Sequence, residues 1–220
     1  MFRNQGRYLQ RLIRVNKLHQ YLRDTEFAAK ELIEIISSDY QEYQAVFQHY
    51  DSKCNESSVL RENFLANELS HNANHFYGQF SRAQLEQEYL MEGLYELEIQ
   101  ISSKQASIDA LSGALLQIAK QGISIVHRNI ASCPNGRHLT NDLRLKTVVW
   151  EGRNQSLHYE DPRGIKIPVD EMFGKLNTVD TSAPDLDPRS GINLSFEVIK
   201  VLDWLTYEKY LEDMQVLIPE

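Results

Sequence analysis

Three side chains suited to chemistry stand within six consecutive positions of this sequence: Arg153, Asn154 and His158. An arginine offers a planar fork of donors to two phosphate oxygens and keeps its charge at any physiological pH. A histidine, with an ordinary pKa near ~6.5, exchanges protons at neutral pH. Asn154 precedes His158 by four residues, so on a helix its amide could orient the imidazole or hold a phosphate. These residue types suit acid–base chemistry on a phosphate ester.

One reaction that these groups could support is RNA cleavage without a metal. It requires removal of the proton of the ribose 2′-hydroxyl, stabilisation of charge on the pentavalent phosphorus and protonation of the departing 5′-oxygen. His158 could transfer the protons and Arg153 could stabilise the charge. A single pair supplies only one proton-transfer group, whereas the reaction benefits from two.

Helical geometry sets conditions on such a site. Positions five apart on a regular helix diverge by roughly 140°, so Arg153 and His158 converge only if the arginine reaches around or the helix loosens, for example at Gly152. Offsets of four and seven return to one face, so Asp142, Lys146 and Arg153 should share a stripe. Lys146 and Asp142 are therefore candidate substrate-binding residues, although they could equally form a structural ion pair.

The segment resembles the HEPN superfamily, whose signature is an arginine, a polar residue that is often asparagine, and a histidine after a short spacer. Arg153, Asn154 and His158 match these three elements, and Asp142 with Lys146 matches an acid-x3-basic pair found upstream in some members. The resemblance covers about residues 85–215. It implies a small helical bundle and ribonuclease activity.

The resemblance also implies partners. HEPN ribonucleases form homodimers in which two motifs face one cleft, and many are toxins or antiviral effectors. Some are neutralised by nucleotidyltransferase-type antitoxins that modify a tyrosine two residues after the histidine. Here Glu160 occupies that position and Tyr159 stands one residue earlier, which departs from the pattern.

Helical periodicity dominates the first 133 residues, which contain no proline. Apolar residues recur every three or four positions over residues 29–50, and a cluster of Asp, Ser, Asn and Cys predicts a break over 51–58. A second helix is expected over 65–80. A Ser-x-x-Gln capping box at 81–84 should open a third helix with a heptad seam over 90–125, which must be covered within the chain or by a second copy.

The last third is punctuated by all six prolines. Thr140 or Asn141 could cap a fourth helix running to about residue 159, followed by a loop over 162–191 with one short helix over 169–176. A final helix should run over 194–211. The sequence thus predicts an all-α, up-and-down helical bundle, with an N-terminal helical extension over residues 1–84 and the HEPN-like bundle over 85–220.

Charge is distributed unevenly along the chain. The net charge is −8, yet residues 1–23 contain six basic residues and no acid. Four arginines of this segment are spaced four, four and three residues apart and fall on one helical face: Arg3, Arg7, Arg11 and Arg14. This face could bind RNA as a substrate-binding stripe, or it could be a solvated surface that pairs with the acidic remainder.

Several classes of protein are disfavoured by composition. Two distant cysteines indicate neither a disulfide framework nor a zinc cluster, and no apolar run of about 18 residues indicates a membrane span. His71 and His75 share a helical face without a third ligand, so no metal site is predicted. Glycines show no phosphate-loop spacing, and no cofactor is expected. The cytoplasm is the expected location.

The leading hypothesis is a HEPN-type, metal-independent endoribonuclease acting as a homodimer on RNA. The first alternative is a catalytically inactive HEPN-like module that binds a nucleotide or a protein and whose long helices mediate assembly. The second alternative is that the Arg-x4-His string is accidental in a coiled-coil scaffold. Fold and motif resemblance alone do not decide among them.

Overall fold

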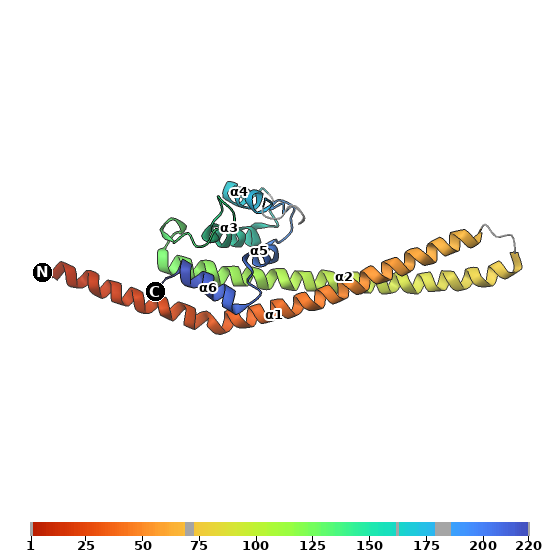
Figure 1. Cartoon of the computed structure of the whole chain (residues 1–220), viewed down its shortest axis with the longest axis horizontal. Coiled ribbons are helices and arrows are strands. Elements are labelled where there is room, and N and C mark those ends of the chain that lie inside the picture. The colour runs from red at the N-terminus through yellow and green to blue at the C-terminus, as the bar shows by residue number, and fades with distance from the viewer. Residues whose placement is uncertain (1, 69–72, 162, 179–185, 220) are drawn as a thin grey trace. The chain divides into compact units, whose positions relative to one another are not determined.

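The computed structural model describes residues 2–68, 73–161, 163–178 and 186–219; for residues 2–19, 60, 61, 63–68 and 73–84 it describes the helical backbone only. Throughout these ranges the regular structure is helical, as predicted for an all-α protein. The elements, shown in Figure 1, are α1 (Phe2–Glu68), α2 (Ala73–His127), the short 3-10 helix η1 (Ile130–Ser132), α3 (Leu145–His158), α4 (Ile167–Leu176), α5 (Ser195–Leu202) and α6 (Tyr207–Leu217).

The chain divides into two compact units. Residues 38–107 form a helical hairpin in which the second half of α1 pairs with the first half of α2. Residues 1–37 and 108–220 form the other unit, the motif unit, which contains α3 to α6. The boundary predicted between residues 84 and 85 lies inside α2 and inside the hairpin.

The hairpin is held by polar contacts that bridge α1 and α2 around a partly buried seam. Lys104 Nζ donates a hydrogen bond to Glu42, and Ser107 Oγ donates to Asp39 Oδ2 at 3.1 Å. Tyr50 Oη donates to Glu98 Oε1 at 2.8 Å. Of the heptad seam predicted over residues 90–125, Leu94 is buried in this part, and Leu90, Leu97 and Ile101 are partly buried.

The predicted break over residues 51–58 is wrong, because α1 continues through it. The unfavourable helix propensity of Ser, Asn and Asp amounts to only a few tenths of a kcal/mol each, which local contacts can offset. Ser58 Oγ bonds back to the Cys54 carbonyl at 3.0 Å, and Lys53 pairs with Glu56 at 2.7 Å.

The capping box predicted at residues 81–84 is also wrong. Helix α2 already begins at Ala73, so Ser81 lies inside a helix and caps none.

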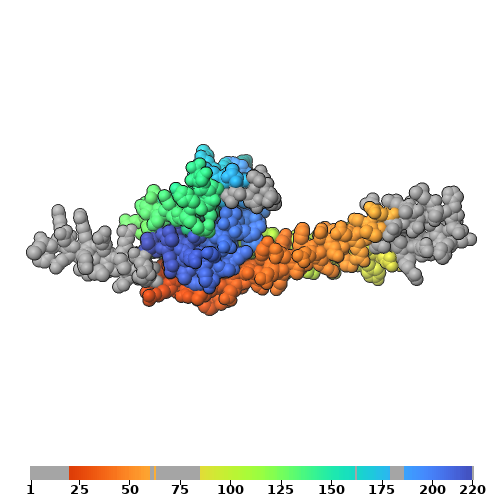
Figure 2. Space-filling view, in the orientation of Figure 1, coloured from red at the N-terminus to blue at the C-terminus, as the bar shows by residue number. Residues whose placement is uncertain are grey.

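The motif unit is built around the second half of α2. Fully buried side chains lie on α2, on α1 and on the C-terminal helices of this unit: Ile108, Leu115, Leu116, Ala119, Ile123, Ala29, Ile36, Phe173, Val198 and Met214. Tyr21 Oη donates to the Ile118 carbonyl at 2.7 Å, and a Cβ placed on Gly122 would lie 2.7 Å from the Tyr21 ring. This glycine therefore permits the close approach of α1. Figure 2 shows the side chains of the C-terminal helices massed together in this unit.

The C-terminal part contains two helices where the sequence predicted one over residues 194–211. α5 ends at Leu202 because Asp203 adopts the left-handed conformation, with φ of 57°. Trp204 follows and is fully buried, packing edge-on against Tyr210 with 5.0 Å between ring centroids. Its indole and Arg137 both donate to the buried Asp213 carboxylate. The short helix predicted over residues 169–176 is confirmed as α4.

Candidate functional site

The helix α3 carries Arg153, Asn154 and His158 and ends at His158. Its buried face consists of Leu145, Val148, Val149, Glu151, Gly152 and Gln155. Arg153 and Asn154 are partly buried at its edges, whereas His158 is exposed. The Asp161 amide donates to the His158 carbonyl at 3.0 Å, which turns the chain away from the helix.

Gly152 serves close packing, not a loosened helix. A Cβ at this position would lie 2.9 Å from Val198 Cγ1 of α5, closer than two carbons can approach. The helix α3 is regular α-helix through Gly152. The expectation that Gly152 loosens the helix and so lets Arg153 approach His158 is therefore wrong. The glycine instead allows α5 to pack closely against α3.

Arg153 faces α2. Its Nε donates a hydrogen bond to the side-chain oxygen of Gln117, and partial burial lowers the pKa of the guanidinium. No carboxylate of the described residues forms a salt bridge with Arg153. The guanidinium therefore retains donors for an anion.

Asn154 is held between a cation and an anion. Lys120 Nζ of α2 donates to its Oδ1 at 2.6 Å, and its Nδ2 donates to Glu151 Oε2 at 2.9 Å. Lys120 also lies over the ring of Trp150, 4.4 Å from the centroid. In this arrangement the Asn154 amide orients Lys120, and neither of these two hydrogen bonds reaches His158. Trp150 itself is only partly buried.

Lys120 is the most perturbed charge near the motif. Burial is the largest cause that lowers the pKa of Lys120, and the positive charge of Arg153 is the next. With a smaller effect of Lys166 they outweigh the attraction to Glu151 and bring the pKa to about 8. Burial disfavours a charged ammonium, and a neighbouring like charge disfavours it further. Lys120 and Arg153 thus form a pair of cations with one nearby acid that is already hydrogen-bonded to Asn154.

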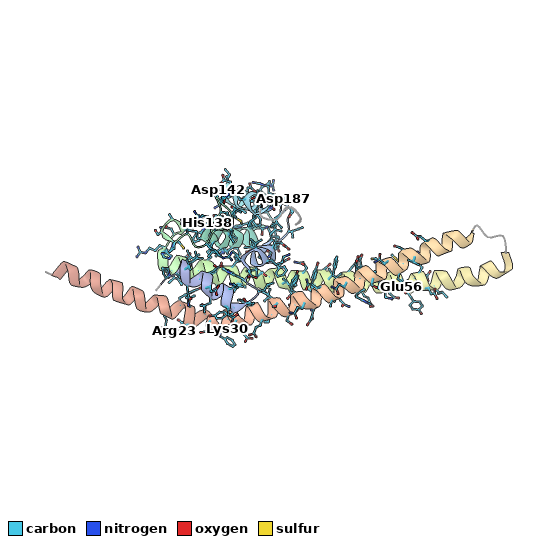
Figure 3. The ribbon with its side chains drawn as sticks, viewed as in Figure 1. Arg23, Lys30, Glu56, His138, Asp142 and Asp187 are labelled. Atoms are coloured by element: carbon cyan, nitrogen blue, oxygen red, sulfur yellow. The ribbon has the colours of Figure 1, made fainter. Side chains whose placement is uncertain are left out.

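Of the predicted substrate-binding residues, Lys146 lies on α3 seven residues before Arg153 and so shares its helical face, whereas Asp142 lies before the helix and does not. Asp142 is exposed in the turn before α3, where its amide donates to Thr140 Oγ1 at 3.3 Å (Figure 3). The helix begins only at Leu145, since residues 139–143 fold into a turn in which the Leu139 amide donates to the Leu143 carbonyl. Lys146 Nζ donates to the Cys133 carbonyl at 2.9 Å and so fixes the preceding loop.

Other predicted groups lie outside the described side chains. Arg3, Arg7, Arg11 and Arg14 fall on the helical backbone of α1, and their side chains are not described. The same holds for His75 of the predicted histidine pair, and His71 lies outside the described ranges. Among the described residues, no cluster of three His, Cys, Asp or Glu side chains suited to a metal ion occurs.

Two residues with structural or electrostatic roles here were missed by sequence reasoning. Lys120 sits 33 positions before Arg153 in a long helix, and nothing in its spacing signals the contact. Gln155, inside the motif spacer, is fully buried and donates to the Ile192 carbonyl at 2.7 Å, while it accepts from the Leu194 amide at 2.9 Å. A polar residue on the buried face of α3 was the signal that could have identified it.

The hairpin contains a separate hollow of about 580 Å³, bordered by His49 and Glu56 of α1 and by Tyr89, Gly93 and Glu96 of α2. It contains none of the predicted site residues. None of the described helices is long and apolar enough to cross a membrane. No protein-family model matches the chain, and comparisons with curated proteins and with solved structures find no match either.

Proposed function

We propose that this protein is a HEPN-type endoribonuclease that cleaves RNA without a metal. The observation that carries the proposal is the neighbourhood of Arg153: a partly buried guanidinium without a carboxylate salt bridge among the described residues, beside a second cation, on the helix that ends at the exposed His158. Such cations favour a bound phosphate, and an exposed imidazole at a helix end can reach a substrate.

In the proposed reaction, an imidazole removes the 2′-hydroxyl proton while the 2′-oxygen attacks the adjacent phosphorus. The bond from phosphorus to the 5′-oxygen breaks, and a protonated imidazole supplies the proton that the 5′-oxygen takes up. Arg153 stabilises the charge on the non-bridging oxygens. The products are a 2′,3′-cyclic phosphate end and a 5′-hydroxyl end, so atoms and protons balance without a co-reactant.

Because each chain supplies one imidazole, we propose a homodimer in which a second His158 completes the site. Three strongly exposed apolar side chains on α3, on α4 and on the segment before α5 would be covered by such a partner: Leu157, Ile167 and Ile192. Leu157 directly precedes His158, which brings the second copy to the motif. We expect Leu157→Glu to give a monomer in light scattering and to lose cleavage.

The decisive experiment compares His158→Ala with His138→Ala. His138 is an exposed histidine in the segment before α3, and its replacement controls for removing an imidazole from the same unit (Figure 3). Loss of a proton-transfer group should slow cleavage by ~10²- to 10⁴-fold. The control should cleave like the wild type, and wild-type cleavage should persist in EDTA. Cleavage by His158→Ala at the wild-type rate would refute the mechanism.

A second candidate is an inactive module that holds a nucleotide or an RNA phosphate. It is favoured by one observation: the side chains of Arg153 and Asn154 form hydrogen bonds with Gln117, Lys120 and Glu151, and none of these bonds reaches His158. Binding of RNA without any cleavage product would support this function. A role as a cytoplasmic toxin or antiviral effector, restrained by a nucleotidyltransferase-type antitoxin, belongs to the first proposal and rests on the resemblance alone.

A further inference from the structure

Lys120 occupies an unusual place for a lysine. The residue is partly buried, and its ammonium lies over the Trp150 ring and donates to Asn154 Oδ1 of α3 at 2.6 Å. None of the described residues forms a salt bridge with it. A neutral amide oxygen and an aromatic face thus take the place that a carboxylate usually fills beside a buried ammonium.

The surroundings disfavour this charge. Arg153 is close enough to repel it, Lys166 in the segment before α4 adds to the repulsion, and with burial these effects outweigh the attraction to Glu151. An apolar side chain of similar length could cover Trp150 without placing a cation there. A charged group kept in a position that opposes its charge is a frequent property of functional sites, because the ligand supplies the missing counter-charge.

We propose that Lys120 and Arg153 together form the phosphate-binding site of this protein, with Gln117 and Asn154 holding the two cations in place. The proposal rests on the proposed function in that it takes the ligand to be a phosphodiester of RNA. A phosphate oxygen would accept from a second N–H of the Lys120 ammonium, which has three and gives one to Asn154 Oδ1, while the Arg153 guanidinium keeps donors beyond the one given to Gln117. The attraction of both cations to the shared anion then offsets the repulsion between them.

Binding should depend on pH in a direction fixed by the groups that face Lys120. These are Arg153 and Glu151 of α3 and Lys166 before α4; burial and the two positive charges outweigh the attraction to Glu151 and lower the pKa of Lys120 to about 8. Phosphate favours the charged ammonium and therefore raises this pKa on binding. Affinity for RNA should be full below pH 8 and should fall as the pH rises through 8, where the unliganded lysine loses its proton.

The test uses a short fluorescently labelled 2′-O-methyl RNA, which lacks the attacking hydroxyl, and measures binding to the full chain by fluorescence anisotropy. Lys120→Met keeps the stem against Trp150 and removes the charge, so affinity at pH 7 should fall about 10- to 100-fold. Lys175→Met, which removes an exposed lysine from α4, should bind like the wild type. Lys120→Arg should retain binding at pH 7 and lose the fall above pH 8, because guanidinium does not titrate there.

Wild-type affinity in Lys120→Met, or an unchanged pH profile in Lys120→Arg, would overturn the inference. Circular dichroism checks the fold of each variant, and if Lys120→Met is unfolded, the pH profile of Lys120→Arg decides alone. Failure of the proposed ribonuclease function would give a different set of results from failure of this phosphate site. A wild-type protein that binds 2′-O-methyl RNA through Lys120 but never cleaves natural RNA retains the phosphate site and refutes the ribonuclease. Cleavage and binding that are both unaffected in Lys120→Met would leave the ribonuclease standing and refute this site.

Discussion

Replacing Gln155 by leucine should destabilise the motif unit more than any change of comparable size on the surface of α3. The Gln155 side chain is fully buried and joins α3 to the segment before α5 by two hydrogen bonds, to the Ile192 carbonyl and from the Leu194 amide. The leucine variant would leave the buried Leu194 amide without an acceptor, at a cost of about 1–3 kcal/mol. The Ile192 carbonyl would lose a bond worth about 1 kcal/mol, since Ile192 is exposed and water can replace part of it.

Leucine recovers part of this loss through its apolar surface, so the net destabilisation should be about 2–3 kcal/mol. For a chain of this size, that corresponds to a fall in Tm of about 5–10 °C. Thermal unfolding followed by circular dichroism measures it directly. Ser156→Ala is the matched control, because Ser156 Oγ bonds within α3 to the Arg153 carbonyl, and its loss should cost less than about 1 kcal/mol. If the two variants melt together, Gln155 does not tie α3 to the segment before α5.

Three further predictions concern packing, charge and reactivity. Gly152→Ala should destabilise the unit by about 1–3 kcal/mol in urea unfolding, because the new methyl overlaps Val198, and a second change Val198→Ala should restore part of the loss. Asp213→Ala should cost about 2–3 kcal/mol by the same measurement, since it leaves the buried Trp204 indole donor without an acceptor and removes the ion-pair partner of the partly exposed Arg137; an equal cost for Asp213→Asn, which keeps one acceptor, would contradict that reason. Burial raises the pKa of the Cys133 thiol to about 11, so iodoacetamide at pH 9 should label Cys54 well before Cys133, and equal rates would contradict the assignment. Because the folded pKa of Cys133 exceeds its ordinary value of 9.0, its contribution to stability should decrease as pH rises from about 9 towards 11.

The helical architecture could be predicted because its signal is local. Apolar residues at three- and four-residue spacing define one face of a helix wherever they occur, and no proline interrupts the first 133 residues. The predicted break over residues 51–58 was wrong because contacts distant in sequence also decide whether a helix continues. Weak helix formers such as Ser, Asn and Asp lower stability by tenths of a kcal/mol, and contacts such as that between Tyr50 and Glu98 lie beyond any local window.

The candidate site was predictable in its residue types but not in its contacts. Arg153, Asn154 and His158 stand together in the sequence, so their chemistry can be weighed from residue type and spacing alone. Lys120 reaches Asn154 only through the packing of α2 against α3, which depends on the tertiary fold. The turn before α3 likewise removes Asp142 from the helix through backbone hydrogen bonds that residue preferences did not reveal.

The division of the motif unit between residues 1–37 and 108–220 has a consequence for synthesis of the protein. Tyr21 is synthesised long before its hydrogen-bond partner Ile118. Lys30 is likewise synthesised long before Tyr207, whose ring centroid lies 4.7 Å from Lys30 Nζ. The hairpin of residues 38–107 can form first and bring Asp39 beside Ser107, which shortens the loop that the rest must close. A nascent chain interrupted before α5 and α6 has α3 but not the elements that support it. We therefore expect the proposed activity to arise only once nearly the whole chain has been made.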